Sequence, residues 1–508
     1  MSEKCLKIFL VFVILLSNQF AVASAKQKDL IQVVAVSKSN MLDASKFTCA
    51  IRNFELWCWG SEKNHGHLGI DNGDNTYYYG AEDPFYSLDV QNPINISDRG
   101  VLKGKKVTDL DLGREHGCVV ADSAAYCWGR GHLGRLGIAG LEAYENNAFG
   151  FTSPFPVPVY SDGVLKGKKV TSIAVGEDHA CVVADGNAYC WGFLGSGALG
   201  IDLQVEEDYV YGYSLPVEVG VDGLLKGKKV TNISAGASTT CAVADGAVYC
   251  WGGVGENIAQ LGLDKESYFF GEDGKINPQG TYVPLAVSTN GSLKGKQVTD
   301  VSVGGNHVCA IADRRVYCWG LNVSSALGVG LDGCLQSNKT IKKLNECLYP
   351  PTSPRLEKDQ LLKKNISFVD TSGDDTTCVV ASNQLFCWGM SAFGSFGTGK
   401  MFDNFHKPTN VSAKNILGQH KLVSVSLESH GCAATATDIF CWGPAIQGDG
   451  VSRGSFLPKK VDFVAPTELK MIKCINPKYP ESEFLSRVIG KSPKCDKGLI
   501  QTQKKPFR

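Results

Sequence analysis

The sequence predicts an all-β protein, a seven-bladed β-propeller with four short antiparallel strands in each blade. Three observations lead to this prediction. A C-x8-C-W-G pattern recurs seven times, with 54 to 69 residues between successive second cysteines. Each copy has the features of a β-hairpin, and further β-rich runs precede and follow it. A single four-stranded sheet cannot bury both faces, whereas a closed ring gives every sheet two neighbours; an open solenoid is the alternative.

The hairpins contain the cysteines that define the repeat. In the third copy, Asp185-Gly186 places a tight turn midway between Cys181 and Cys190. The two cysteines then face each other on antiparallel strands, where Cα atoms lie roughly 4.5–5.5 Å apart, within disulfide reach. A metal site is the alternative, but thiolate clusters favour C-x2-C spacing. We therefore predict one disulfide in each blade, in the pairs Cys49–Cys58, Cys118–Cys127, Cys181–Cys190, Cys241–Cys250, Cys309–Cys318, Cys378–Cys387 and Cys432–Cys441.

Two further strands complete each unit. An alternating run precedes the hairpin, at Val33–Ser37, Val107–Gly113, Val170–Gly176, Val230–Gly236, Val298–Gly304, Phe368–Gly373 and Leu422–Leu427. A fourth short strand follows Trp-Gly, around Pro158–Val159, Pro216–Val219, Pro284–Val287, Pro408–Val411 and Pro458–Val461. The tryptophan is expected to fill the space between neighbouring blades, and the glycine to let the backbone turn or approach closely.

The first 25 residues are predicted to be an export signal. Lys4 and Lys7 precede an apolar run, Ile8–Leu16, and Ala23-Ser24-Ala25 is a small-x-small cleavage pattern. That run is too short to span a bilayer, and we expect no transmembrane segment in the mature chain. We therefore expect a secreted protein or one of the cell envelope or periplasm.

The cysteine count agrees with an oxidising compartment. Of 19 cysteines, Cys5 lies in the signal, and the remaining 18 all have a plausible partner. Two pairs beyond the hairpins, Cys334–Cys347 and Cys474–Cys495, are inferred from their proximity in sequence. The domains are then a propeller over 26–465, with a disulfide-containing insertion at 329–360, and a C-terminal appendage over 466–508.

A leucine-glycine pair follows most Trp-Gly modules, as at Leu136-Gly137 and Leu199-Gly200. With it, the units resemble RCC1-type repeats, especially the exported, disulfide-containing kind, over residues 31–462. The resemblance implies seven blades and a ring closed by strands from both chain ends. On that basis we expect Pro458–Val461 to complete the blade that contains Val33–Ser37.

The resemblance implies less about function. The founding nuclear member exchanges guanine nucleotide on a small GTPase and contacts chromatin, partners that an exported chain does not meet. Exported relatives bind other proteins. Fold analogy alone is a weak basis for function. The chain has 51 basic and 51 acidic residues, and this balance argues against nucleic acid as a partner.

The loops indicate a binding surface. Antiparallel succession places the long segments 61–90, 130–158, 193–215 and 253–283 on one face, where they contain 17 acidic, five basic and 17 aromatic residues. Leu-Lys-Gly-Lys-Lys turns bring basic residues to the opposite face. Aromatic residues in loops on a rigid scaffold are typical of protein and sugar binding sites. The predicted binding residues are Tyr77, Tyr78, Tyr79, Phe85, Tyr86, Tyr209, Tyr211, Tyr213, Tyr268, Phe269 and Phe270; the alternative is that these aromatics fold inward and fix each loop to its blade.

No catalytic motif, cofactor site or metal site is predicted. His116, His179, His307 and His430 each stand two residues before a hairpin cysteine, but Thr239 and Thr376 occupy this position in other units, which favours a repeated structural hydrogen bond over a metal ring. We therefore expect a monomeric, non-catalytic protein that binds an extracellular or cell-envelope protein. A carbohydrate-binding propeller is the alternative, and an enzyme is less favoured.

Overall fold

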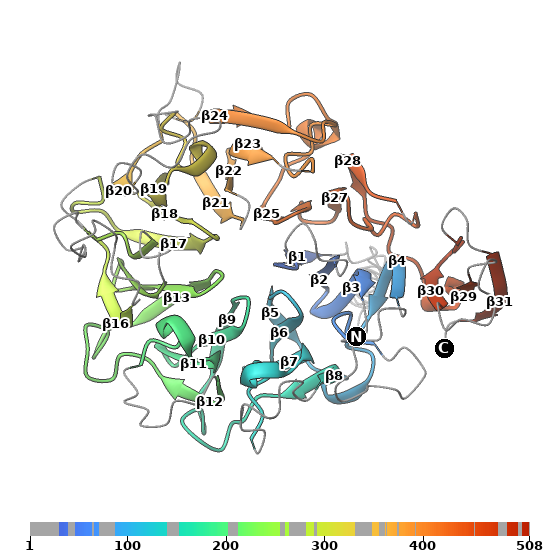
Figure 1. Cartoon of the computed structure of the whole chain (residues 1–508), viewed down its shortest axis with the longest axis horizontal. Coiled ribbons are helices and arrows are strands. Elements are labelled where there is room, and N and C mark those ends of the chain that lie inside the picture. The colour runs from blue at the N-terminus through green and yellow to red at the C-terminus, as the bar shows by residue number, and fades with distance from the viewer. Residues whose placement is uncertain are drawn as a thin grey trace, which may run out of the picture. The chain divides into compact units, whose positions relative to one another are not determined.

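The structure of the chain is a computed structural model. It describes residues 30–38, 46–62, 66–70, 87–139, 152–201, 212–253, 260–263, 281–288, 292–330, 348–354, 361, 363–372, 375–391, 393–451, 453–475, 485–495 and 500–506. Residues 31–508 belong to one compact unit. Within this unit, seven β-sheets surround a common axis, and the first strand of each sheet lies innermost (Figure 1). The predicted seven-bladed propeller is confirmed.

Each blade is built from four strands that follow one another along the chain. The strands of blades 1 to 4 are β1 (Ile31–Val36), β2 (Lys46–Arg52), β3 (Glu55–Glu62), β4 (Ser87–Asn95); β5 (Val107–Leu112), β6 (His116–Ala121), β7 (Ala124–Arg130), β8 (Thr152–Pro158); β9 (Val170–Val175), β10 (His179–Ala184), β11 (Asn187–Phe193), β12 (Gly212–Glu218); and β13 (Val230–Ala235), β14 (Thr239–Ala244), β15 (Ala247–Gly252), β16 (Thr281–Ala286).

Blades 5 to 7 repeat this order, and three more strands follow them. These strands are β17 (Val298–Val303), β18 (His307–Ala312), β19 (Arg315–Leu321), β20 (Leu348–Thr352); β21 (Ile366–Thr371), β22 (Thr376–Ala381), β23 (Gln384–Ser391), β24 (Asp403–Asn410); β25 (Ser424–Leu427), β26 (Gly431–Ala434), β27 (Ile439–Gly443), β28 (Ser455–Lys460); and β29 (Lys470–Ile475), β30 (Leu485–Gly490), β31 (Ile500–Pro506).

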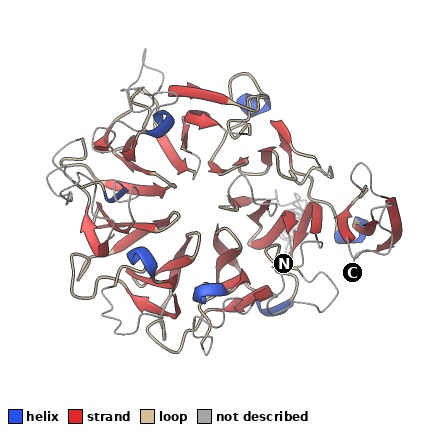
Figure 2. Cartoon of the chain, viewed as in Figure 1, coloured by secondary structure: helices blue, strands red, loops and turns tan. Residues whose placement is uncertain are grey.

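Strands dominate the described part of the chain, with short 3-10 turns between them (Figure 2). Those turns include η1 (Gly100–Leu102), η2 (His132–Gly134), η3 (Gly195–Gly197), η6 (Val323–Ser325), η8 (Ile416–Gln419) and η9 (Pro466–Glu468). In blade 5, the fourth strand comes from the predicted insertion at residues 329–360. Strand β20 lies inside this range and completes the blade.

The ring closes differently from the prediction. Strand β28, which contains Pro458, pairs with β27 in blade 7 and does not enter blade 1. Blade 1 has its own fourth strand, β4, so an exchanged strand has no vacant edge to fill. Closure instead relies on contacts between β1 and blade 7: the Ile31 N–H donates to the Ala436 carbonyl at 2.9 Å, and the Val36 N–H donates to Ser426 Oγ at 3.1 Å.

All seven hairpin disulfides are present as predicted. In each, the two cysteines are directly opposite across the second and third strands, with Cα atoms 4.1 Å apart. The pair Cys474–Cys495 is also confirmed, with a Cα separation of 5.6 Å. Cys334 and Cys347 lie outside the described residues.

The repeated tryptophans join neighbouring blades, as the Trp-Gly motif predicts. Trp251 of blade 4 is fully buried, and its indole N–H donates to the Ala198 carbonyl of blade 3 at 3.0 Å. Gly200, two residues after Ala198, has φ +69°, and a Cβ there would lie 2.8 Å from Trp251 Nε1. The Leu-Gly pair is therefore a docking point for the next tryptophan. The same bond recurs from Trp128 to His67, Trp191 to Arg135, Trp319 to Gln260, Trp388 to Ala326 and Trp442 to Ser395.

Around the axis, the inner strands leave one edge without a strand partner. Side chains of the preceding blade accept hydrogen bonds from N–H groups of this edge, which satisfies buried main-chain donors. Asp111 Oδ2 accepts the Val175 N–H at 2.7 Å, and Asp370 Oδ2 accepts the Leu427 N–H at 2.7 Å. Serine does the same at Ser234–Val303, Ser302–Thr371 and Ser426–Val36. The ring is thus held by a series of latches from blade to blade.

The C-terminal appendage extends the sheet of blade 1. Strand β30 pairs in parallel with β4, and β29 and β31 continue outward to give a seven-stranded sheet. The main chain after β30 is fixed to the blade because the Lys491 N–H donates to Asn92 Oδ1 at 3.0 Å. Lys491 also forms an ion pair with Glu468 at 2.7 Å. The appendage therefore covers the outer edge strand of blade 1.

Candidate functional site

The propeller has two faces that differ in their connections. On one face, here called the loop face, the third strand of each blade ends and the fourth begins, so the long segments leave from it. On the other, the turn face, lie the hairpin turns and the Leu-Lys-Gly-Lys-Lys turns. Strand order and pairing within every blade give this arrangement. The described strands therefore show that each long segment leaves from and returns to the loop face, while the basic turns lie on the turn face.

Of the predicted binding residues, the structure describes Tyr213 alone. Tyr213 lies in β12 opposite Gly192, and its half-buried ring packs against the core formed by blades 3 and 4. It follows the alternative prediction, in which an aromatic residue fixes a loop to its blade. The other predicted residues lie outside the described ranges: Tyr77, Tyr78, Tyr79, Phe85, Tyr86, Tyr209, Tyr211, Tyr268, Phe269 and Phe270.

The loop face also has an exposed apolar patch over blades 6 and 7 that the sequence did not reveal. Phe402 is 63 % exposed and Met401 41 % exposed, just before β24, and Leu457 of β28 is 47 % exposed. The ring of Phe393 contacts Phe402, with centroids 5.7 Å apart. The Gly399 N–H donates to the carbonyl of Phe456, next to Leu457, and joins the two blades here. Large exposed apolar groups gathered in one place are typical of interaction sites.

The turn face has repeated lysine–aromatic contacts. In blade 3, Lys168 lies over the ring of Tyr189, with Nζ 5.5 Å from the centroid. Interaction with the phenol group of Tyr189 raises the pKa of Lys168. Equivalent pairs are Lys105–Tyr126, Lys228–Tyr249, Lys296–Tyr317 and Lys364–Phe386. The lysines on either side of these contacts are exposed; they include Lys103, Lys106, Lys166, Lys169, Lys226, Lys229, Lys294 and Lys363. This face therefore presents cations from several adjacent blades.

The repeated histidines form structural hydrogen bonds between blades, as predicted. His179 Nε2 lies 2.8 Å from Thr240 Oγ1, and that hydroxyl donates to the Ala198 carbonyl at 3.2 Å. Because the hydroxyl proton is used, His179 donates through Nε2–H. Burial lowers the pKa of His179 to about 3, so the ring stays neutral. The same contact joins His307 to Thr377 and His430 to Thr48.

The second blade departs from this pattern. His116 is fully buried, and neither ring nitrogen has a hydrogen-bond partner among the described residues. The position that holds threonine in the other interfaces is Ala180 in blade 3. The Arg135 carbonyl, which accepts the Trp191 indole N–H at 2.9 Å, corresponds to the Ala198 carbonyl. This interface therefore has the histidine and the carbonyl found in the others, but it lacks the hydroxyl that would join them.

Replacing Ala180 with threonine is expected to raise the free energy of unfolding by about 1 kcal/mol, because the new hydroxyl can bond both His116 and the Arg135 carbonyl. Urea denaturation of Ala180→Thr and the parent protein measures the change. Ala180→Val is the matched control, since valine has the shape of threonine without its hydroxyl. Equal stability of the two variants would show that the missing hydroxyl is not the cause.

A polar cluster on the axis joins the first four blades. Lys38 Nζ donates to Asp111 Oδ2 at 3.0 Å and to the Ala235 carbonyl at 2.8 Å, and it also bonds the Val175 carbonyl. In blade 6, burial raises the pKa of Asp370 to about 7, while the hydrogen bond from the Leu427 N–H and the positive charge of Lys38 act to lower it. Both carboxylates accept main-chain N–H groups, so they serve as latches between blades.

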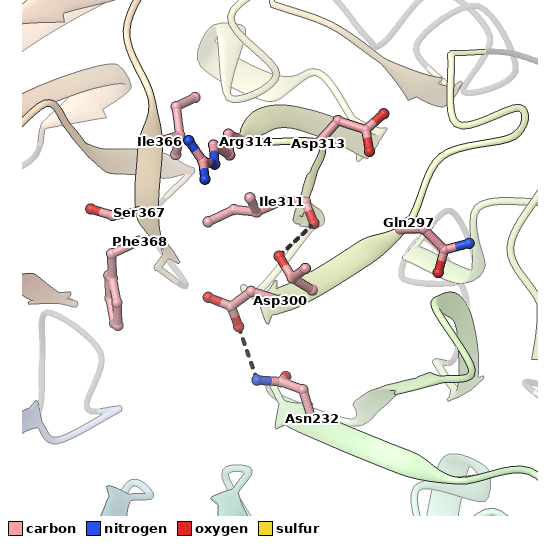
Figure 3. A pocket seen from close by; sticks show the side chains of 10 residues that line it. Asn232, Gln297, Asp300, Ile311, Asp313, Arg314, Ile366, Ser367 and Phe368 are labelled. Carbon is pink, nitrogen blue, oxygen red and sulfur yellow. Dashed lines mark hydrogen bonds between the residues drawn. The ribbon is translucent and has the colours of Figure 1, made fainter.

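A pocket opens between blades 4, 5 and 6, with a volume of about 600 Å³ (Figure 3). Its side chains come from inner strands of all three blades: Asn232 from β13, Asp300 from β17 and Phe368 from β21. The hairpin turn of blade 5, with Asp313 and Arg314, lies at its edge on the turn face. Sequence reasoning missed this pocket because its residues come from three different repeats.

The described residues offer no basis for metal chemistry. No group of three or more His, Cys, Asp or Glu side chains in these ranges is arranged to hold a metal ion. The described cysteines are all in disulfides. No helix in the same ranges combines the length and the apolar composition needed to cross a bilayer.

The propeller is built from seven sequence repeats. Each repeat forms one sheet with its own disulfide, and a contact between Trp-Gly and Leu-Gly joins neighbouring sheets. The family model described as the regulator of chromosome condensation (RCC1) repeat matches residues 122–183 and 185–243. The ultraviolet-B receptor UVR8 of Arabidopsis thaliana is 25 % identical over 361 residues, covering 63 % of this chain and 73 % of UVR8. The mitochondrial RCC1 domain-containing protein RUG3 of the same plant is 22 % identical over 367 residues, covering 63 % of this chain and 74 % of RUG3.

Solved structures show the same fold. Human WBSCR16 matches with a TM-score of 0.56 and 19 % identity, over 78 % of this chain and 84 % of that one. Yeast RCC1 (Prp20) bound to Kap60 matches with a TM-score of 0.55 and 19 % identity, over 78 % of each chain. These matches support an RCC1-like repeat family for this chain. Propellers of this family generally mediate protein binding, and they are typically non-catalytic binding proteins or exchange factors.

Proposed function

We propose that this protein is an exported, non-catalytic binding module that captures an extracellular or cell-envelope protein on its loop face. One observation carries the proposal: strand order sends the four long acidic and aromatic segments from the same face of a rigid ring. Rigid scaffolds with variable loops on one face are common in recognition proteins. The scaffold is already ordered, so it loses little conformational entropy when a partner binds.

The described part of the loop face supports a protein partner. The exposed patch of Phe402, Met401 and Leu457 lies on that face; exposed apolar patches are typical of interaction sites, and Phe and Met are enriched in protein interfaces. The patch is confined to blades 6 and 7. A partner that contacts both this patch and the long segments of blades 1 to 4 would bind an asymmetric surface. Such a surface favours a protein over a sugar that binds similar pockets in several blades.

The cysteines support export. Eight disulfides lie within the described residues, one in each blade and one in the appendage, and such bonds persist in oxidising compartments. The N-terminal pattern of residues 1–25, with cleavage after Ala25, fits the same location.

Replacing Tyr78, Tyr211 and Phe269 together with serine is expected to abolish partner capture and leave the melting temperature nearly unchanged. The reason is that aromatic side chains in long loops bury area against a partner more than against the ring. Capture from the native extracellular milieu, run beside a glycan array, measures the effect and separates a protein partner from a sugar.

The matched control replaces exposed aliphatic residues of the turn face. Val164, Val221 and Leu224 are 40 %, 53 % and 50 % exposed, and their change to serine should leave capture intact. A large loss of stability in the aromatic variant, with capture retained, would contradict the proposal. In that case the aromatics would have the inward role seen for Tyr213.

A further inference from the structure

In the pocket between blades 4, 5 and 6, two of the lining side chains are hydroxyls whose hydrogens are already engaged. Thr299 Oγ1 donates its hydrogen to the Ile311 carbonyl at 3.3 Å, and Ser367 Oγ donates to the Val380 carbonyl at 3.3 Å. Their hydroxyl hydrogens are therefore engaged, and lone pairs remain. The interior thus favours a ligand that donates hydrogen bonds.

The carboxylate of Asp300 lines the pocket and is bonded to the amide of Asn232 (Figure 3). The side-chain N–H of Asn232 donates to Asp300 Oδ1 at 3.0 Å, and the Val301 N–H donates to the same oxygen at 3.0 Å. Asn232 Oδ1 has no described donor, but it is fully buried, so a ligand in the pocket does not reach it. No hydrogen bond joins Asp300 Oδ2 to the described residues, and a carboxylate oxygen without a partner favours a ligand that donates to it.

One side of the pocket is apolar. Phe368 of β21, Ile311 and Ile366 are its apolar lining residues (Figure 3). In blades 2 to 5 the position of Phe368 in the inner strand is polar, at Asp109, Ser172, Asn232 and Asp300. The aromatic ring is therefore a feature of this interface and not of the repeat. An alkyl stem or a cation can pack on such a ring.

The charges near the entrance are mostly engaged with one another. Lys296 Nζ lies 3.3 Å from Asp313 Oδ2 and 5.5 Å from the centroid of Tyr317. Arg314 is exposed in the hairpin turn and has no described partner. Inside, burial raises the pKa of Asp300 to about 6, opposed by the hydrogen bonds from Val301 and Asn232. Asp300 is therefore charged at pH 7.5 and largely neutral at pH 5.

We propose that this pocket binds a primary ammonium or guanidinium group on an apolar stem, the chemistry of a lysine or arginine side chain presented by a protein partner. The cation reaches Asp300 Oδ2, and the stem lies against the apolar side of the pocket that includes Phe368. The proposal rests on the protein-binding function and adds an anchor on the turn face. A free small amine has the same chemistry, and the experiment separates the two sources.

The first test uses the full-length protein and n-butylammonium, followed by calorimetry at pH 7.5, with 1-butanol and valerate as neutral and anionic counterparts. Butylammonium should bind, and Asp300→Asn should weaken it at least tenfold. Arg314→Gln should tighten butylammonium binding several-fold, because it removes a positive charge that repels the cation. Affinity should also fall several-fold between pH 7.5 and pH 5, as Asp300 takes up a proton.

Asp300→Asn keeps the size of the side chain and its accepting oxygen, and Arg314 is exposed, so both variants should fold; circular dichroism checks this. Valerate binding that is lost in Arg314→Gln would overturn the proposal, because the pocket would then be an anion site. Butylammonium binding that is absent, or that Asp300→Asn leaves unchanged, would also overturn it.

The second test asks whether the ligand is a partner's side chain. If Asp300→Asn weakens both butylammonium binding and partner capture, the side chain of a protein is the source. If it weakens only butylammonium binding, the assignment to a partner protein is overturned and the source is a free amine. If capture survives in Asp300→Asn but fails in the Tyr78, Tyr211 and Phe269 variant, the loop-face function stands independently of the pocket.

Discussion

Replacing Cys241 and Cys250 together with alanine is expected to lower the free energy of unfolding by about 3 kcal/mol. The crosslink closes a short loop, and its removal restores conformational freedom to the unfolded chain. Both sulfur atoms are fully buried, in the core shared by blades 4 and 5, so their loss also removes packing contacts. Guanidinium denaturation under non-reducing conditions measures the change.

The disulfide of the appendage provides the control. Cys474–Cys495 spans a longer sequence separation, 21 against 9 residues, but its core is a small separate cluster that includes Ile472 and Val488. Its removal should loosen β29–β31 and leave the unfolding of the ring nearly unchanged. Equal losses of ring stability in the two double variants would mean that the blade disulfides have no special role in the ring.

Replacing Trp251 with alanine is expected to cost about 3–5 kcal/mol of stability, the usual range for a buried tryptophan. The indole fills the interface between blades 3 and 4 and bonds the Ala198 carbonyl, so the variant loses packing and leaves that carbonyl with one donor fewer. Chemical denaturation followed by the fluorescence of the remaining tryptophans measures the loss.

Trp251→Phe separates the two contributions. Phenylalanine keeps most of the apolar surface but cannot donate, so its cost should be clearly smaller than that of alanine, by about 2 kcal/mol. A matching test is Gly200→Ala, because a Cβ there meets the indole at 2.8 Å and the backbone has φ +69°. If all three variants kept the parent stability, the contact between Trp-Gly and Leu-Gly would not hold the blades together.

Features that depend on neighbouring residues in sequence were predictable. The turn Asp185-Gly186 between Cys181 and Cys190 determines the hairpin, its register and its disulfide at once. The seven copies of the C-x8-C-W-G unit then predict the number of blades. Each sheet has to bury both of its faces, and this requirement predicts a closed ring. The tryptophan contact followed from the same logic, because a large apolar group next to a glycine has to find space between sheets.

Features that depend on the assembled ring were not predictable in the same way. The fourth strand of blade 1, Ser87–Asn95, was overlooked, and ring closure was then assigned to Pro458–Val461 by family resemblance. The latches from Asp111, Asp370 and the serines need two inner strands side by side, which no single repeat reveals. The same is true of the pocket at Asn232, Asp300 and Phe368.

The candidate binding surface was only partly predictable. Alternation of strand direction correctly predicted that the strands on either side of the long segments end and begin on one face. Whether an aromatic residue points outward depends on its local packing, and Tyr213 shows that one of them packs inward. The exposed Phe402 and Met401 stand in a short segment with no recurring pattern, so nothing in the sequence distinguished them from core residues.

The most direct test of a ring of independently crosslinked blades is disulfide mapping of the purified, unreduced protein by proteolysis and mass spectrometry. The structure predicts one bond between the two cysteines of each C-x8-C-W-G unit and one between Cys474 and Cys495. Free thiols at the hairpin positions, or bonds that join cysteines of different blades, would contradict it.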